Sequence, residues 1–193
     1  MLSISNAESV DVGDRILAAA ASCVRDFGVE RVTLAEIARR AGVSRPTVYR
    51  RWPDTRSILA SLLTDRIVGA WRAAPARAAG REALVSRIVE VVGNLRRDEL
   101  ILTVLRSDPE LAMVYIAERL GTSQQILIDM VAEELRKAQA DSTVRPADPR
   151  RLAAVVLLIT QSVIQSGRIV DPIIDADGLD AELAHALNGY LTP

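Results

Sequence analysis

Apolar residues recur along this chain three and four positions apart, and no stretch shows the strict alternation that favours a β-strand. This periodicity predicts a first helix over about 12–27, ended by Gly28, and two short helices within 33–51. A long helix follows from near Thr55, and the Ala- and Pro-rich segment 73–80 is the expected linker. The polar residues before the first helix are expected to be disordered.

The remainder of the chain also follows the helical period. Asp-Pro pairs at 108–109 and 148–149 are helix start signals, because an Asp cap precedes a proline that fits the first turn. The expected helices cover about 81–96, 98–106, 108–138 with a break at 121–122, 148–167 and 178–191. The pattern predicts an all-α fold of nine or ten helices, with an N-terminal domain over 11–54 and a larger helical domain over 55–193.

Residues 33 to 52, TLAEIARRAGVSRPTVYRRW, carry the densest local signals. Thr33 and Glu36 have the spacing of a capping box, and Gly42 suits the left-handed conformation that ends a helix. Ser44 is expected to cap the next helix, in which Pro46 falls in the first turn and is tolerated. Two short helices joined by a tight turn are therefore predicted, which is the helix-turn-helix arrangement of a DNA reader.

The second of these helices is too short and too polar to exist for its own packing. Its expected exposed residues, Arg45, Thr47, Tyr49 and Arg50, are types that hydrogen-bond phosphates and base edges. Between Arg31 and Arg56 the chain holds seven arginines against two acids, although its net charge is only −1. Nearly all cationic residues of the chain are arginines, so the use of arginine instead of lysine is no argument for DNA binding. The clustering of seven arginines in this segment is the argument.

The composition of the whole chain limits the kind of core it can form and the functional classes to which it can belong. Hydrophobic residues make up 49% of the 193 residues but aromatic residues only 3%, so the core must be built from Ala, Val, Leu and Ile. A single Cys excludes an internal disulfide, no signal peptide is visible, and the apolar run 152–159 is far shorter than the roughly 20 residues that span a bilayer. Neither a catalytic triad, a phosphate loop nor a metal-ligand spacing is found, so an enzyme and a bound metal or cofactor are not expected. A cytoplasmic protein is the expectation.

The segment ILAAAASCVRDFGVERVTLAEIARRAGVSRPTVYRRWPDTRSIL resembles the TetR (tetracycline-repressor-like) family of transcriptional regulators. The shared features, in order, are a first helix ending in Phe27-Gly28, the "IA..AGVS" stretch that ends at Ser44, the "tlY.hF" core around Tyr49, and an entry to the long helix at Pro53. Two positions depart from the family pattern. Trp52 stands where Phe is commoner, and Thr55 stands where a lysine is usual.

The resemblance implies a homodimer that places two reading helices in successive major grooves of a pseudo-palindromic operator. It implies that Thr33 and Tyr49 hold phosphates, whereas Arg45 and Thr47 reach base edges. Arg56 stands one position after the lost lysine, and this shift turns a side chain by about 100° around a helix. The expected DNA-binding residues are Thr33, Ser44, Arg45, Pro46, Thr47, Tyr49, Arg50 and Arg56.

Several residues keep two interpretations. Arg39 and Arg40 could contact phosphate or form pairs on the helix surface, and Arg51 could turn toward the first helix instead of DNA. Cys23 is read as a buried, inert thiol, with a redox sensor as the alternative. His185 is read as a packing or interface residue, because no second His or Cys accompanies it.

The C-terminal domain is expected to hold an effector pocket and the dimer interface, as the resemblance implies. A small hydrophobic effector is the favoured ligand, since helical bundles offer apolar pockets with few polar groups. The alternative is a ligand-independent regulator or adaptor controlled by a protein partner. Candidate pocket residues are Trp71, Leu102, Met113, Tyr115 and Gln161. Candidate interface residues, chosen because the helix from 148 is apolar nearly all round, are Val156, Ile159, Val163, Leu183 and Leu187.

Overall fold

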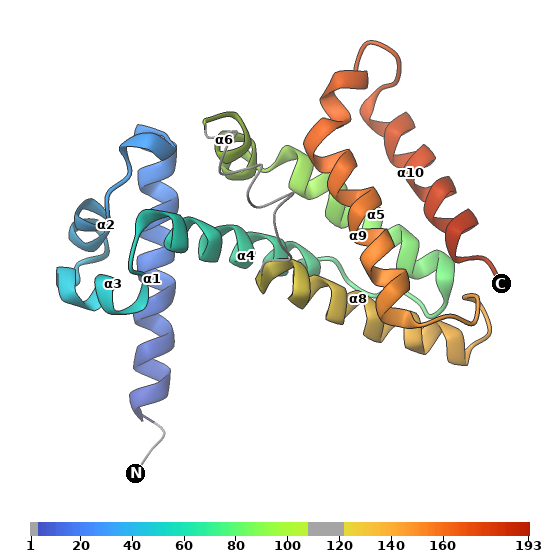
Figure 1. Ribbon diagram of the computed structural model, residues 1–193, viewed down its shortest axis with the longest axis horizontal. Helices are drawn as coiled ribbons and strands as arrows, with labels where there is room; N and C mark the ends of the chain where they lie inside the picture. Colours follow the sequence, from blue (N-terminus) through green and yellow to red (C-terminus); the bar gives the residue numbers. More distant parts are fainter. Residues whose placement is uncertain (1–3, 108–121) are drawn as a thin grey trace. The chain divides into compact units, whose positions relative to one another are not determined.

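Every regular element in the described residues, 4–107 and 122–193 of a computed structural model, is a helix (Figure 1). The chain divides into two compact units. The first unit runs from the amino terminus to Arg66 and takes in a later helix, and the second unit holds most of the remainder. The all-α fold expected from the periodicity is therefore confirmed.

The first unit contains α1 (Ile4–Phe27), the 3₁₀ turn η1 (Val29–Arg31), α2 (Leu34–Ala41), α3 (Arg45–Arg51), the first part of α4 (Thr55–Ala73), and α6 (Glu99–Ser107). Its core is a layer of small and branched apolar side chains with no exposure or almost none. Ile16 and Cys23 from α1 meet Ile37 from α2, Val48 from α3, and Ile58 from α4. Leu100 and Val104 of α6 belong to the same cluster.

The first helix is longer than the periodicity predicts, because it begins at Ile4 and not near residue 12. The segment before residue 12 contains neither proline nor glycine. Extending an existing helix adds one hydrogen bond for each residue fixed, whereas starting a new helix is costly. A polar segment next to a buried helix can therefore continue it, and the expectation of disorder from Ile4 onward was wrong.

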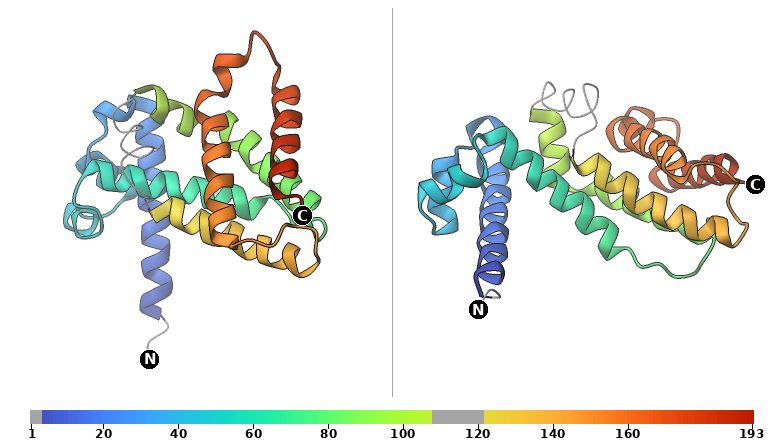
Figure 2. Two further views of the ribbon diagram at one scale, coloured as in Figure 1. Left: turned by 45° about the vertical axis from the view of Figure 1, so that its right-hand side comes forward. Right: turned by 60° about the horizontal axis from the view of Figure 1, so that its bottom comes forward.

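The second unit is built from α5 (Arg81–Arg97), α8 (Thr122–Ala140), α9 (Pro149–Ser166) and α10 (Ala176–Leu191), together with the end of α4. Helix α8 packs along α9, while α5 contacts α8, α9 and α10. A 3₁₀ turn, η3 (Gly167–Val170), lies between α9 and α10, which Figures 1 and 2 show as neighbouring helices. Residues 74–80 form the expected non-helical linker.

Aspartate caps fix where the last two helices begin. Asp148 accepts hydrogen bonds from the backbone N–H of Arg150 at 2.8 Å and of Arg151 at 3.4 Å, as its Asp-Pro signal predicts. Asp175 accepts from the Gly178 N–H at 2.8 Å and starts α10 two residues before the predicted position. A cap is satisfied locally, so each of these starts is encoded within four residues of sequence.

The segment Pro149–Val170 is long and apolar enough to cross a membrane by length and composition alone. The run 152–159 underestimates it, because apolar residues continue beyond the polar Thr160 and Gln161. Only 22% of its most apolar window is buried in the protomer, which leaves part of this helix without cover. Core helices of soluble proteins have the same length and composition, so these two properties alone do not indicate a membrane span.

Candidate nucleic-acid interface

The turn between α2 and α3 has the geometry that its sequence predicts. The Thr33 hydroxyl accepts a hydrogen bond from the Glu36 backbone N–H at 3.2 Å and caps α2. Gly42 ends the helix in the left-handed conformation, with φ 64° and ψ 36°. The Val43 N–H then donates to the Ala38 carbonyl at 3.1 Å, which closes the turn. Local backbone chemistry thus sets the angle at which the chain enters α3.

Ser44 occupies the N-cap position of α3 but makes no capping hydrogen bond. Its hydroxyl is instead 2.7 Å from the hydroxyl of Thr47, one turn further along the exposed start of α3. The predicted role of the Ser44 side chain as a cap is therefore wrong. The two hydroxyls form a polar pair at the outer surface of the turn.

Helix α3 is held to the first unit by one fully buried side chain, Val48. Trp52 at its carboxyl end is half-buried, and its indole N–H donates to the Ser61 hydroxyl on α4 at 2.8 Å. Figure 1 shows α3 beside α2 and α1 within this unit. Most other side chains of α3, including Arg45, Tyr49 and Arg50, are exposed.

The structure places all eight predicted DNA-binding residues in the first unit, and seven of them are exposed. Thr47 is half-buried. The Tyr49 side chain is 51% exposed, although aromatic rings usually gain from burial. Arg56 is exposed in the first turn of α4, beside a half-buried Thr55. Exposed residues along this surface are Thr33, Ser44, Arg45, Pro46, Tyr49, Arg50 and Arg56.

Arg40 joins α2 to α1 and is not directed to solvent. Its guanidinium donates to the Ser22 hydroxyl at 2.8 Å and forms an ion pair with Asp26, both on α1. It also pairs with Glu36 at 3.0 Å, and it lies 4.6 Å from the centre of the Phe27 ring. Of the two interpretations left open for this arginine, the helix-surface pair is confirmed.

Glu36 carries two arginine contacts at once. Arg39 donates to both carboxylate oxygens, at 2.8 Å to Oε2 and 2.7 Å to Oε1, and Arg40 donates to the same Oε1 at 3.0 Å. Hydrogen bonds from Arg39 and then from Arg40 stabilise the charged form and lower the pKa of Glu36 to about 2. The Glu36 carboxylate therefore bonds to these arginines and not to the Thr33 backbone N–H, so half of the predicted capping box is used.

Arg51 turns toward α1. A Cβ atom placed on Gly13 would come within 2.8 Å of a guanidinium nitrogen of Arg51, so this charge lies directly over the helix surface. Cys23 is fully buried in the same unit, and burial raises the pKa of its thiol. A raised pKa disfavours the reactive thiolate, which supports the inert interpretation.

The predicted effector-pocket residues are divided between the two units. Leu102 belongs to the first unit, whereas Trp71 and Gln161 belong to the second, and Met113 and Tyr115 lie outside the described residues. Trp71 is buried beneath the Arg87 guanidinium, 4.1 Å from the ring centre. The Gln161 side chain accepts a hydrogen bond from Gln124 at 3.4 Å.

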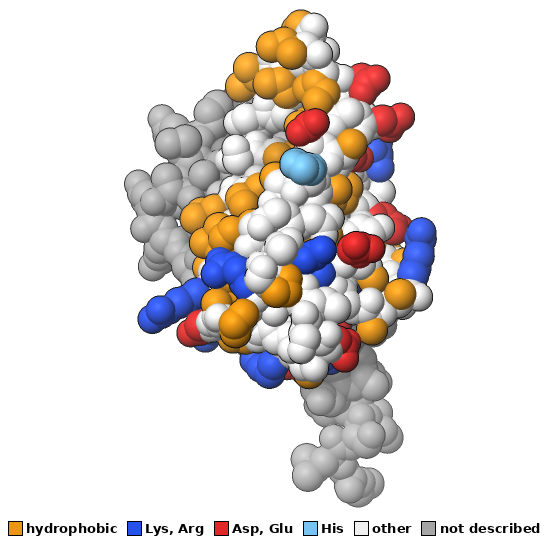
Figure 3. Space-filling view, turned by 90° about the vertical axis from the view of Figure 1, so that its right-hand side faces the viewer, with side chains coloured by type: hydrophobic (Ala, Val, Ile, Leu, Met, Phe, Trp, Pro, Cys, Tyr) orange, Lys and Arg blue, Asp and Glu red, His pale blue; other side chains and the backbone are white. Residues whose placement is uncertain are grey.

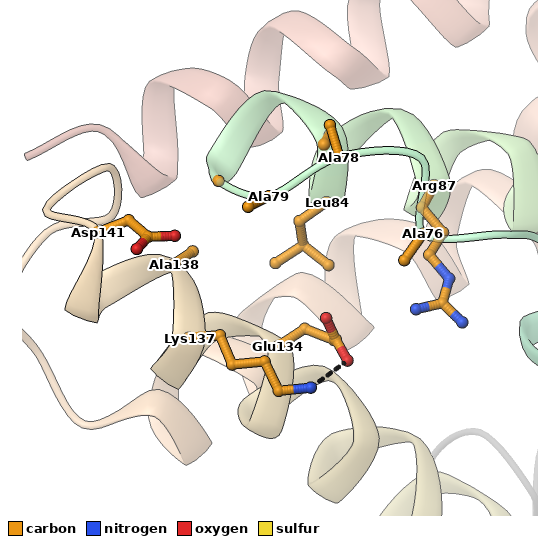
Figure 4. A pocket seen from close by; sticks show the side chains of 11 residues that line it. Ala76, Ala78, Ala79, Leu84, Arg87, Glu134, Lys137, Ala138 and Asp141 are labelled. Carbon is orange, nitrogen blue, oxygen red and sulfur yellow. Dashed lines mark hydrogen bonds and ion pairs between the residues drawn. The ribbon is translucent and has the colours of Figure 1, made fainter.

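A hollow of about 180 Å³ lies elsewhere in the second unit, between the 74–80 linker, the start of α5 and the end of α8 (Figure 4). It could not be predicted from the sequence, because its walls are mostly alanines of the same kind as ordinary helix and linker residues. Arg87, Glu134, Lys137 and Asp141 supply charge around this alanine-lined hollow.

The five predicted interface residues differ in how much surface they keep in the protomer. Val156, Leu183 and Leu187 are buried in the core of their own protomer, at 2%, 3% and 0% exposure, so a partner has almost no surface to cover there. Ile159 and Val163 are half-buried and keep some surface. The sequence reasoning missed the large apolar side chains that are exposed in this region: Val155, Leu158, Ile169 and Ile173.

Figure 3 shows apolar side chains gathered at the upper end of one face, whereas charged side chains lie mostly along its right edge and lower half. On α9, Leu158 is 65% exposed and Val155 is 36% exposed. At the turn after α9, Ile169 and Ile173 are 78% and 87% exposed. His185 is exposed on α10, and the described residues contain no group of side chains suited to a metal ion. Exposed apolar surface is thus present at two places: along α9, at Val155 and Leu158, and on the turn that follows it, at Ile169 and Ile173.

Two short helices joined by a tight turn, of which the second buries one residue and exposes arginine and tyrosine, define a helix-turn-helix DNA-binding protein. Comparison with known proteins agrees. The family model described as "Bacterial regulatory proteins, tetR family" matches residues 16–62. An HTH-type transcriptional regulator of Mycobacterium tuberculosis is 63% identical over 191 residues, which is 99% of this chain and 100% of that protein.

Solved structures share the fold at lower identity. The transcriptional repressor QsdR of Rhodococcus erythropolis, of the TetR family, matches with a TM-score of 0.70 at 18% identity, over 94% of this chain and 96% of that chain. RolR in complex with resorcinol matches with a TM-score of 0.68 at 15% identity, over 96% and 90%. The chain belongs to the tetR family and is a transcriptional regulator with a DNA-binding helix-turn-helix. Regulators of this family bind DNA, usually as dimers, and are not enzymes.

Proposed function

We propose that this regulator is a homodimeric repressor of the bacterial cytoplasm that binds a pseudo-palindromic operator and leaves it when a small effector binds. The observation that carries the proposal is the surface of α3, where one side chain is buried and the polar residues around it are exposed. A helix held in this way has little reason to exist except to enter a groove of DNA.

Within this proposal, Arg45 reads base edges at the start of α3, because an arginine fork suits the paired acceptors of guanine. Thr47 assists it, and Tyr49 and Thr33 hold phosphates through their hydroxyls. Arg56 supplies the phosphate contact of the missing lysine from the exposed first turn of α4. Ser44, Pro46 and Arg50 complete the proposed DNA surface.

A second copy of the chain is the proposed cover for the exposed apolar side of α9. Leu158 and Val155 extend the half-buried Ile159 and Val163 into one stripe, and burying a leucine or valine side chain stabilises by about 1.5–3 kcal/mol. Most members of the family dimerise, and a two-fold dimer brings the same stripe of both copies together. The two α3 helices would then meet half-sites about 34–36 Å apart.

Effector control is proposed from the helical second unit. An effector that binds one arrangement of the dimer better than another shifts the population toward that arrangement. If the two α3 helices of that arrangement no longer match the fixed spacing of the operator half-sites, affinity for DNA falls. The hollow beside the 74–80 linker supports such a site. RolR, whose fold is similar, was solved with resorcinol bound, which supports a small organic molecule as the class of effector.

The DNA contacts are tested by fluorescence anisotropy with DNA from upstream of the protein's own gene and with scrambled DNA of equal length. Arg45→Ala is expected to lower affinity for the operator more than for scrambled DNA, by a factor corresponding to about 1–3 kcal/mol. Tyr49→Phe removes only a phosphate contact and is expected to weaken both equally. If Arg45→Ala weakened both DNAs equally, its role in base reading would be wrong.

Salt dependence tests the proposal as a whole. Specific binding by a dimer with several phosphate contacts is expected to weaken steeply between 50 and 200 mM salt, by roughly 10³-fold for six contacts. Arg56→Gln is expected to reduce the slope of log affinity against log salt by about two contacts per dimer, because each protomer loses one. A folded dimer without a specific shift on its upstream DNA at moderate salt would contradict the repressor function.

A further inference from the structure

The hollow in the second unit has the size of a small-molecule site. Its volume of about 180 Å³ is comparable to the ~150 Å³ of an engineered protein cavity that holds benzene. Ala76, Ala79 and Leu84 give it apolar walls (Figure 4), and Ala83 also lines it. Small side chains on three different segments leave this space open, since any one of them could fill it by being larger.

Opposite charges stand at the two ends of the hollow. Figure 4 shows Asp141 at one end and Arg87 at the other, with Leu84 and the alanines between them. Lys137 and Glu134 lie along the middle and form an ion pair with each other at 3.1 Å, so together they add no net charge. The end charges are therefore the ones left to act on a ligand.

Both end groups have bonding capacity to spare. A guanidinium has five N–H donors, and Arg87 uses two hydrogen bonds, to the Ala74 carbonyl at 2.8 Å and to the Trp71 carbonyl at 2.9 Å. The Asp141 carboxylate is exposed and has no ion pair or side-chain hydrogen bond within the part of the chain that the structure describes. One end thus offers donors to an anion and the other end offers acceptors to a cation.

We propose that this hollow binds a small zwitterion, with its carboxylate at Arg87, its ammonium group at Asp141 and its apolar middle against Leu84 and the alanines. The side of the hollow formed by the end of α8, from Glu134 to Asp141, is about 10 Å long, and a flexible ω-amino acid of about six carbons matches this scale. Such a ligand satisfies both ends and buries its methylene groups. A purely apolar effector of the same size leaves both charges unused.

A ligand in the hollow would change the contacts of α4, the helix whose first turn carries Arg56. The Trp71 and Ala74 carbonyls lie at the carboxyl end of α4, where the last carbonyls of a helix lack partners within it, and Arg87 satisfies them while stacking on Trp71. Arg56 stands in the first turn of the same helix. A ligand carboxylate that bonds to Arg87 therefore competes with the Trp71 and Ala74 carbonyls for its N–H donors and weakens the bonds that hold the end of α4. This step rests on the proposed effector control.

Isothermal titration of the full-length protein tests the site with four probes of matched length. These are 6-aminohexanoate, hexanoate, hexylamine and hexanol. The zwitterion is expected to bind about tenfold more tightly than either singly charged probe, the size of effect that one charge-assisted hydrogen bond supplies. Equal binding of 6-aminohexanoate and hexanol would overturn the assignment of the two ends.

Two variants with matched controls locate the binding. Ala83→Leu fills the hollow and is expected to abolish binding, whereas Ser86→Leu adds the same bulk at an exposed position of the same helix and should retain it. Asp141→Asn is expected to weaken 6-aminohexanoate about tenfold and to leave hexanoate unchanged, whereas Glu133→Gln, an exposed acid outside the hollow, should change neither. Unchanged binding in Ala83→Leu would overturn the site.

The link to α4 has its own readout, which is operator affinity with and without 6-aminohexanoate. The ligand is expected to weaken operator binding of the unmodified protein, and Arg87→Lys, which keeps the charge but not the paired carbonyl bonds, is expected to bind ligand without this effect. Binding in the hollow that leaves operator affinity unchanged would overturn the link and count against effector control. Release by a different small molecule, with no binding in the hollow, would overturn the site and leave the proposed function standing.

Discussion

The hydrogen bond from Trp52 to Ser61 gives a quantitative test of how α3 is held in place. Trp52 ends α3 where the family more often has phenylalanine, and its indole N–H reaches the Ser61 hydroxyl on α4 at 2.8 Å. Trp52→Phe keeps an aromatic ring and removes the donor, and Ser61→Ala removes the acceptor. The two single variants and the double variant together form a cycle that isolates the interaction between the side chains.

The expected size of this interaction follows from its surroundings. Both side chains are half-buried, the distance is that of a good hydrogen bond, and neither group is charged. A neutral hydrogen bond of this kind contributes about 1 kcal/mol to the free energy of unfolding. For a chain of this length, a loss of that size lowers the midpoint of thermal unfolding by roughly 2–4 °C.

Urea unfolding followed by circular dichroism gives the four free energies of unfolding, measured at one protein concentration because dimer stability depends on it. The coupling energy between the two variants is expected to be about 1 kcal/mol. Ser86→Ala, at an exposed position of α5, is the control for loss of a serine hydroxyl and should change stability little. A coupling energy below about 0.3 kcal/mol, the usual error of additivity, would refute the bond as a stabilising contact.

Three further outcomes are expected. Gly42→Ala should destabilise by about 1 kcal/mol, because an L-residue resists φ 64°, whereas Gly69→Ala, with no neighbour near the added Cβ and no positive φ, should stabilise a helix interior; urea midpoints would distinguish them. Glu36→Gln should lower the free energy of unfolding at pH 7. The difference from the unmodified protein should shrink as pH falls from 4.5 toward 2, because the Glu36 carboxylate stabilises the fold only while it is ionised and it becomes protonated as pH approaches its lowered pKa. A difference that does not depend on pH would refute this reasoning. Leu158→Glu should turn the dimer into folded monomers in sedimentation velocity, and an intact dimer would show that this stripe is not the interface.

The helix-turn-helix could be predicted almost completely from the sequence because its signals are local. The Thr33 cap and the left-handed Gly42 each depend on residues within a few positions along the chain. Where the outcome depended on a choice between local partners, the prediction failed. The Ser44 hydroxyl had a backbone N–H and the Thr47 hydroxyl within reach, and it bonds to Thr47.

Long-range partners could not be read from residue type. The role of Arg40 depends on Asp26, which lies fourteen positions earlier on another helix. In α9, a helix that is apolar nearly all round does not reveal which stripe faces its own core. Val156 was expected at an interface but is buried, whereas Leu158 two positions later is exposed.

The hollow escaped prediction for a related reason. Pockets are predicted from large or polar side chains, such as Trp71, but this one is produced by side chains that are too small to fill a space. Only the packing of α8 against the linker and the start of α5, which are distant from α8 in sequence, reveals that Ala79, Ala83 and Ala138 leave room. Alanine-rich chains are therefore poor subjects for locating ligand sites from sequence alone.

The charge composition has a practical consequence at this same place. Lys137 is the only lysine in the chain, and it lies at the rim of the hollow. Amine-directed chemistry, whether an N-hydroxysuccinimide dye or an acetyl donor, therefore has one side-chain target in the whole protein. A fluorophore attached there reports from one side chain without any engineered cysteine, the α-amino group being the other amine that can react, and acetylation there would unpair Glu134 and change the charge of the hollow in one chemical step.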